Sequence, residues 1–82
     1  MKFTIEKYNN GTYYIGFKNE LVYDRNMAVN LNLTYEEYTK ILEKHNASLN
    51  TVGEYQFFNM KDINQAIEEL IPILILNILV EG

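Results

Sequence analysis

One histidine and several carboxylates are the side chains that could do chemistry here, and their spacing forms no catalytic or metal-binding motif. His45 is the single histidine, and no motif places a Ser, Asp or Glu beside it, so we interpret it as a half-buried helix residue rather than a general base. The pairs Glu36-Glu37 and Glu68-Glu69 fall on predicted helices, where adjacent side chains point about 100° apart and do not converge on one ion. The sequence has no cysteine, which excludes a thiol nucleophile and a thiolate metal site. We therefore expect no enzyme activity, no metal and no cofactor.

Residues 27–42 raise the possibility of DNA binding. In this segment, MAVNLNLTYEEYTKIL, the small, apolar and turn residues have the spacing of a helix-turn-helix. In a DNA-binding motif of this kind the first turn of the second helix meets the base edges. Here that turn would hold Tyr35, Glu36 and Glu37, and only two lysines follow on the same helix. The formal net charge of -4 also disfavours attraction to phosphate backbones or anionic lipid. We expect the spacing to specify helix packing, with the acidic face turned toward solvent or a basic protein surface.

The seven tyrosines are the residues most suited to an interface with another protein. Tyrosine is enriched at such interfaces because it brings contact area with few rotatable bonds. Two alternatives are equally supported for Tyr14 and Tyr35. Each could contact a partner protein, or each could lie partly buried at the edge of the small core. The candidate partner-binding residues are Tyr14, Tyr35, Glu36, Glu37, Lys40 and Glu43.

The longest apolar run is LIPILILNILV at residues 70–80, and it is the candidate for self-association. It is shorter than the roughly 20 residues that a membrane-spanning helix needs, and it contains Asn77. A small domain can bury only one or two sides of such a segment, and the exposed remainder would form a patch of the kind that marks interfaces. We expect a homodimer, since twofold symmetry is the commonest arrangement. The candidate self-association residues are Ile73, Ile75, Leu76 and Leu79.

The length and composition of the chain indicate one ordered domain, residues 1–82. The 82 residues suffice for a single small core, and 48% hydrophobic against 22% charged residues argues against disorder. The N-terminal stretch MKFTIEKYNN alternates polar and apolar residues and lacks the apolar block of a signal peptide. We therefore expect a cytoplasmic protein that does not associate with membranes.

Residues 2–18 are predicted to form a β-hairpin, because apolar residues alternate along them. A three-residue loop at 9–11 pairs Ile5 with Ile15, whereas a two-residue turn would place these residues on opposite faces. Gly11 then takes the left-handed conformation that three-residue loops need.

Two helices are predicted in the middle of the chain. A short helix over 25–31 is expected to follow an N-cap at Asp24. A second helix begins at a capping box made by Thr34 and Glu37 and ends near Asn46.

Two further strands and a third helix complete the predicted elements. The strands are LVY at 21–23 and EYQFF at 54–58. The third helix opens at Asn59 or at Lys61-Asp62, and its apolar residues recur every three or four positions.

Pro72 makes the end of this third helix ambiguous, because proline disfavours helical geometry at the residue before it. Apolar spacing favours a helix that kinks there and continues to about residue 79, while the β-branched content favours a strand over 73–80. We expect the kinked helix. The predicted fold class is α+β. An N-terminal antiparallel β-hairpin and a further strand form one part, and they pack on the other part, which consists of a helix-turn-helix-like pair of helices and a C-terminal helix kinked or ended at Pro72.

Two blocks of the sequence, LNLTYEEYTKIL (31–42) and GEYQFFNMKDINQAIEEL (53–70), resemble small proteins of phages and prophages from low-GC Gram-positive bacteria. Many small phage proteins bind and redirect host proteins, and anti-CRISPR proteins are one such group. The resemblance implies a non-enzymatic protein-binding module that inhibits or modulates a host protein, for example a defence protein, in the cytoplasm of the host. A small helix-turn-helix DNA-binding regulator and a structural or assembly protein of the virion are the alternatives.

Overall fold

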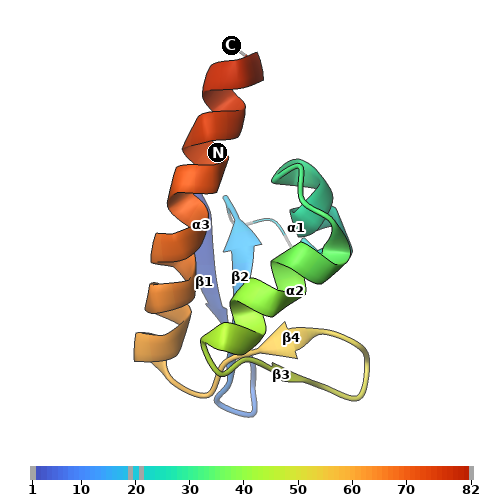
Figure 1. The fold of residues 1–82 in the computed structure, drawn as a ribbon. Coiled ribbons are helices and arrows are strands. Elements are labelled where there is room, and N and C mark those ends of the chain that lie inside the picture. The colour runs from blue at the N-terminus through green and yellow to red at the C-terminus, as the bar shows by residue number, and fades with distance from the viewer. Residues whose placement is uncertain (1, 19, 21, 82) are drawn as a thin grey trace.

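The computed structural model describes residues 2–18, 20 and 22–81, and the side chains of those residues as far as Asn77. The described residues form two antiparallel strand pairs and three helices (Figure 1), which confirms the predicted α+β class. In chain order the elements are β1 (Phe3–Lys7), β2 (Tyr13–Phe17), α1 (Asp24–Asn30), α2 (Tyr35–Lys44), β3 (Ser48–Leu49), β4 (Tyr55–Gln56) and α3 (Met60–Glu81).

The β1–β2 hairpin has the predicted register. Ile5 lies opposite Ile15 and Phe3 opposite Phe17, and the two phenyl rings stack with their centroids 4.9 Å apart. Gly11 has a φ of 87°, the left-handed conformation that we expected in the loop. The alternation of apolar residues therefore determines the pairing, because a shift of one residue would turn the apolar face outward.

The predictions for residues 21–24 are corrected. Leu21 lies outside the described residues, and Val22 and Tyr23 are not in a strand. Asp24 is not the N-cap of α1: Tyr23 has that position, with extended backbone and no capping side chain, and Asp24 is the first helical residue. The physical reason is a competing partner, since the Asp24 carboxylate accepts a hydrogen bond of 2.8 Å from the backbone N–H of Tyr55 in β4.

The predicted strand at 54–58 is present as the shorter β4, and it pairs with β3, a strand that was not predicted. The backbone groups of Tyr13 and Phe57 exchange two hydrogen bonds, of 2.8 and 2.7 Å. This bridge joins the β3–β4 pair to the end of the hairpin.

The predicted start of α2 is confirmed. The Thr34 hydroxyl accepts a hydrogen bond from the backbone N–H of Glu37, and the Glu37 carboxylate accepts one from the backbone N–H of Thr34. The helix ends at Lys44, and Asn46, the predicted end, has a left-handed φ of 67° just beyond it. Asn32 has a φ of 55° and makes the turn between α1 and α2.

Helix α3 begins after Asn59, whose side-chain oxygen accepts a hydrogen bond of 2.9 Å from the backbone N–H of Asp62. It runs through Pro72 to Glu81, so the predicted continuation of the helix is confirmed and the alternative strand over 73–80 is wrong. Buried side chains lie on both sides of the proline, among them Leu70 and Leu74. Packing on both sides therefore offsets the cost of proline within a helix.

The core lies between the β1–β2 hairpin and the three helices. Helix α3 packs along β2, and α1 packs on α2, as Figure 1 shows. The fully or almost fully buried hydrophobic residues are Ile15, Phe17, Met27, Ala28, Leu31, Tyr38, Leu42, Phe57, Ile63, Ala66, Leu70 and Leu74.

Candidate functional site

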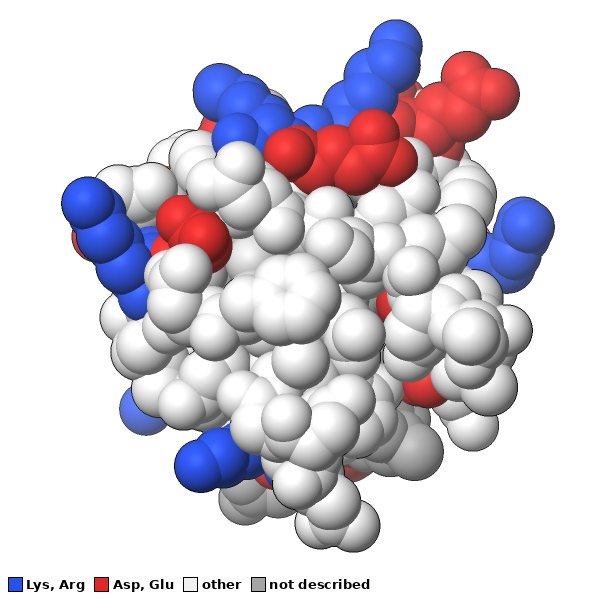
Figure 2. Space-filling model, turned by 90° about the horizontal axis from the view of Figure 1, so that it is seen from below, with Lys and Arg blue, Asp and Glu red and all other residues white. Residues whose placement is uncertain are grey.

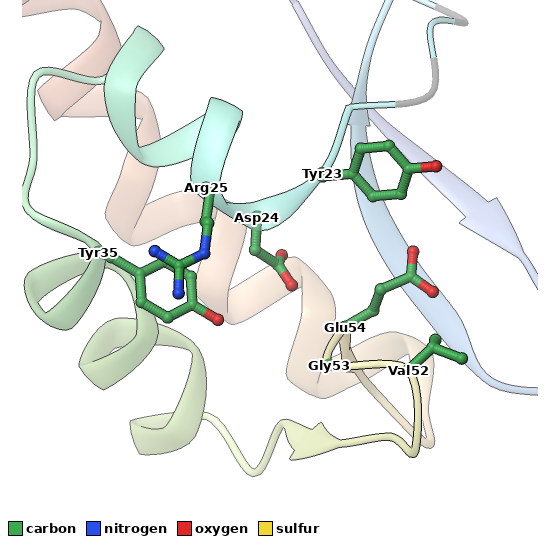
Figure 3. Close-up of a pocket in the computed structure, with 7 residues that line it drawn as sticks. All are labelled: Tyr23, Asp24, Arg25, Tyr35, Val52, Gly53 and Glu54. Atoms are coloured by element: carbon green, nitrogen blue, oxygen red, sulfur yellow. The ribbon is translucent and has the colours of Figure 1, made fainter.

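A cleft of about 300 Å³ opens between the start of α1, the start of α2 and the β3–β4 loop. Figure 3 shows the side chains around its mouth. Three elements that are distant in sequence therefore contribute to one concave site. The lining residues are Tyr23, Asp24, Arg25, Tyr35, Val52, Gly53 and Glu54.

Two carboxylates, those of Asp24 and Glu54, approach the cleft from α1 and from the β3–β4 loop (Figure 3). Asp24 is half-buried. Burial raises the pKa of Asp24, the hydrogen bond from the Tyr55 backbone lowers it, and the charge of Glu54 raises it again, with a net increase. Among the described residues neither carboxylate forms an ion pair with a lysine, arginine or histidine. The two cleft carboxylates thus have no ion-pair partner among the described residues, although Arg25 also lines the cleft.

The β3–β4 loop is held in shape by Asn50. Its side-chain oxygen accepts hydrogen bonds from the backbone N–H groups of Val52, at 3.0 Å, and Glu54, at 2.8 Å. Gly53 has a φ of 85°, a conformation that glycine adopts without strain. The local sequence therefore fixes the position from which Glu54 extends into the cleft.

The opposite wall carries a cation. The guanidinium of Arg25 lies over the ring of Tyr35, 4.4 Å from the ring centroid, and Figure 3 shows the two side chains together. In the described part of the chain Arg25 makes no ion pair, although Asp24 is its neighbour in sequence. Stacking on Tyr35 keeps the guanidinium at this wall by a cation–π interaction.

Two buried hydroxyls lie near the cleft carboxylates, although neither tyrosine lines the cleft. Those of Tyr8 and Tyr38 are the buried side-chain polar atoms that lack a hydrogen-bond partner of good geometry in the described structure. Burial raises the pKa of both groups; the charge that raises it further is chiefly Glu54 for Tyr8 and Asp24 for Tyr38. Each of these hydroxyls thus lies near one of the two cleft carboxylates, and a contact of the Tyr8 hydroxyl with the Glu54 carboxylate contributes to the raised pKa of Tyr8.

The predicted partner-binding residues separate into two groups. Tyr35 lines the cleft, whereas the half-buried Tyr14 stacks on Tyr8 with centroids 4.4 Å apart. Glu37 is used in the capping box. Glu43 accepts a hydrogen bond of 2.7 Å from the Tyr55 hydroxyl, which raises the pKa of that tyrosine to about 12.

The other two predicted residues, Glu36 and Lys40, are exposed on α2 and do not line the cleft. The sequence does not indicate that Tyr23, Asp24, Arg25 and Glu54 belong to one site. The turn signal around Gly53 could have indicated a shaped loop, but no local pattern indicates that this loop lies against α1.

His45 is half-buried and joins α2 to α3. Its Nε2 lies 2.6 Å from Oε2 of Glu69, and the Lys44 ammonium lies 3.1 Å from Oε1 of the same carboxylate. His45 is thus the C-cap of α2 and not a residue within the helix, and Glu69 lies beside it although no sequence motif indicated a neighbouring carboxylate. Within the described residues no group of three or more His, Cys, Asp or Glu side chains is arranged to hold a metal ion.

The end of the molecule that carries the hairpin loop and the β3–β4 pair has a second notable surface, which we call the underside. Figure 2 views this end, where uncharged side chains fill the centre and most charged ones lie toward the edge. Phe58, just after β4, is 61% exposed. We use the name underside for the surface of the β3–β4 pair and the segment that leads into α3, whose exposed apolar residues are Leu49, Val52, Phe58 and Met60.

The predicted self-association residues also differ from one another. Ile75 and Leu76 are 51% and 61% exposed on α3, while Ile73 is partly buried against the core. The side chain of Leu79 lies outside the described residues. Asn77 donates a side-chain hydrogen bond to the carbonyl of Leu31, which attaches this part of α3 to the end of α1.

No family model, curated protein or solved structure matches this chain. None of the helices that the structure describes combines the length and apolar character needed to cross a membrane. The site must therefore be interpreted from its own chemistry. Two carboxylates and the exposed ring of Tyr23 around one cleft are suited to binding a cationic group.

Proposed function

We propose that this chain is a non-enzymatic protein-binding module that inhibits or modulates a host protein, as the resemblance to phage proteins implies. The observation that carries the proposal is the phenyl ring of Phe58, which is 61% exposed in the segment between β4 and α3. The end of the molecule that carries the β3–β4 pair shows mostly uncharged side chains at its centre (Figure 2). The protein would act in the cytoplasm of a bacterial host.

The composition of the underside supports this proposal. Cores of protein interfaces are depleted in charged residues and enriched in aromatic residues and methionine, and their rims are polar. Phe58 and Met60 are apolar side chains exposed to water, an arrangement that costs free energy unless a partner covers it. Truncation of a central aromatic residue commonly weakens an interface by about 2 kcal/mol or more.

A helix-turn-helix regulator is the second candidate, favoured by the packing of α1 on α2 through a tight turn at Asn32. Several groups that would face a DNA groove have partners within the chain instead. Tyr35 carries the stacked Arg25, and Glu37 caps its own helix. These contacts and the net charge of -4 favour the protein-binding function.

Self-association through α3 is part of the proposal. Ile75 and Leu76 project from the last turns of the helix whose side chains are described, and Figure 1 shows this end of α3 extending beyond the other elements. A second copy would cover this apolar surface by pairing the helices across a twofold axis.

The test is a binding measurement with two single variants. Tagged wild-type protein, Phe58→Ser and Val29→Ser are incubated with lysate of a low-GC Gram-positive bacterium, and the retained proteins are quantified. Val29 is an exposed apolar residue on α1, so its variant controls for the loss of a surface side chain. We expect a partner that the wild type and Val29→Ser retain equally and that Phe58→Ser loses; equal retention by all three proteins would contradict an interface at the underside.

A further inference from the structure

We infer that the cleft between Asp24 and Glu54 binds an arginine side chain of the protein partner. The inference rests on the proposed protein-binding function and names the chemistry of one contact within it. Four observations carry it: the unpaired carboxylates, the aromatic walls, the size of the cleft and the buried hydroxyls beside it.

The carboxylates provide the attraction. Asp24 and Glu54 enter the cleft from different elements (Figure 3), and no cationic side chain of the described residues pairs with either. A guanidinium presents several N–H donors in a fixed plane and can bind carboxylates with paired hydrogen bonds. The half-buried position of Asp24 reduces screening by solvent, which strengthens such a contact relative to one on an open surface.

The tyrosines provide the shape that favours arginine over a metal ion. Tyr23 is 56% exposed at the mouth of the cleft, so its ring is accessible to a flat cation that stacks on it. Arg25 already stacks on Tyr35 in this way at the opposite wall. A metal ion would need at least a third ligand, and the described residues contain no cluster of three.

The size of the cleft indicates a single side chain. Its volume of about 300 Å³ lies at the lower limit of pockets for small ligands, which range over about 300–1,000 Å³. A side chain inserted from a partner fills such a site, while the rest of the partner extends over the neighbouring β3–β4 loop, where Val52 is exposed.

The buried hydroxyls are an independent indication that the polar groups here are incompletely satisfied. Tyr38 is fully buried and its hydroxyl has no hydrogen-bond partner within the described structure, although buried polar groups usually have one. Burial raises the pKa of Tyr38, and the charge of Asp24 raises it further, which places this hydroxyl near one of the cleft carboxylates.

The test is a titration of isotope-labelled protein with two capped tripeptides, acetyl-Gly-Arg-Gly-amide and its neutral isostere with citrulline. Backbone amide signals of the cleft, above all those of Gly53 and Glu54, report binding at neutral pH. We expect the arginine peptide to shift these signals and the citrulline peptide to bind more weakly by about fivefold, the effect of one partly exposed ion pair. Equal affinity for both peptides, or shifts confined to other parts of the protein, would overturn the inference.

Single variants locate the site. Glu54→Gln should weaken the arginine peptide by about threefold to fivefold, and Glu68→Gln, which removes the same charge from an exposed position on α3, should not change it. Asp24→Asn decides the same question if Glu54→Gln fails to fold, as judged by circular dichroism.

Arg25→Gln should strengthen binding of the arginine peptide, because it removes a competing cation from the cleft wall. Unchanged affinity in folded Glu54→Gln or Asp24→Asn would overturn the inference.

The same variants separate this inference from the proposed function. If Glu54→Gln still retains the partner that Phe58→Ser loses, and the peptides do not bind, the arginine site is wrong while the protein-binding function stands. If no partner is retained by any protein, the proposed function fails, and the peptide titration alone decides whether the cleft binds arginine.

Discussion

The carboxylate of Asp24 accepts a hydrogen bond from the backbone N–H of Tyr55, and this 2.8 Å contact joins the start of α1 to β4. The two residues are 31 positions apart. The contact holds the β3–β4 loop beside α1, so that Glu54 and Asp24 face one cleft. It also explains why Asp24 does not cap its helix: the carboxylate is engaged by another element.

The unpartnered hydroxyl of Tyr38 leads to a stability prediction. Tyr38→Phe keeps the buried ring and removes a polar atom that has no hydrogen-bond partner in the described structure. We expect the free energy of unfolding, measured in urea, to increase by about 1 kcal/mol, since a buried unsatisfied group costs that much or more. Tyr23→Phe, at an exposed ring, is the control. A less stable Tyr38→Phe would show that the hydroxyl makes a favourable contact.

The link between α2 and α3 should depend on pH. Hydrogen bonds from His45 and then Lys44 hold the pKa of Glu69 below its ordinary value of 4.5. A carboxylate whose pKa is lower in the folded protein stabilises the fold fully at pH values above its ordinary pKa. This stabilisation is lost as the pH falls through the lowered pKa of the folded protein. Glu69→Gln should therefore be less stable than wild type in urea at pH 7, and the difference should decrease as the pH falls below 4.5. A difference as large at pH 3 as at pH 7, or no difference at pH 7, would contradict this role; Glu68→Gln is the control.

The exposed residues of α3 predict a dimer at micromolar concentration. Ile75→Glu or Leu76→Glu should shift the molecular mass in light scattering toward the monomer while the helical content remains, because both side chains are more than half exposed. A wild type that is monomeric over the whole concentration range would contradict the dimer. Loss of the fold in either variant would instead assign the side chain to the core of one subunit.

Duplex DNA should bind weakly or not at all at physiological salt. The net charge is -4, and Lys44, one of two lysines on α2, already pairs with Glu69. A gel-shift assay with generic duplex DNA should therefore show no complex. Tight, salt-sensitive binding that is lost in Lys40→Gln or Lys44→Gln would establish the helix-turn-helix function instead.

The parts of the fold that the sequence predicted are those determined by local spacing. The hairpin register follows from alternation around Gly11, and the start of α2 follows from Thr34 and Glu37. The continuation of α3 through Pro72 was predictable from its apolar spacing, although proline alone argues against it. β3 was missed because two residues are too few to show a period.

The cleft was not predictable, because it depends on a contact between distant elements. Asp24 is a typical N-cap residue by its local sequence, and only the proximity of Tyr55 gives its carboxylate another partner. Tyr35 was predicted as a partner-binding residue from its type, but its neighbour in the cleft, Glu54, belongs to a loop whose position the sequence does not indicate.

The most direct test of the proposed function is photo-crosslinking from defined positions inside host cells. A photoreactive phenylalanine derivative replaces Phe58 on the underside in one protein and Val29 on α1 in another. The account predicts one crosslinked host protein from position 58 and none from position 29. No crosslink from position 58, or the same crosslinked proteins from both positions, would contradict a specific protein-binding function of this surface.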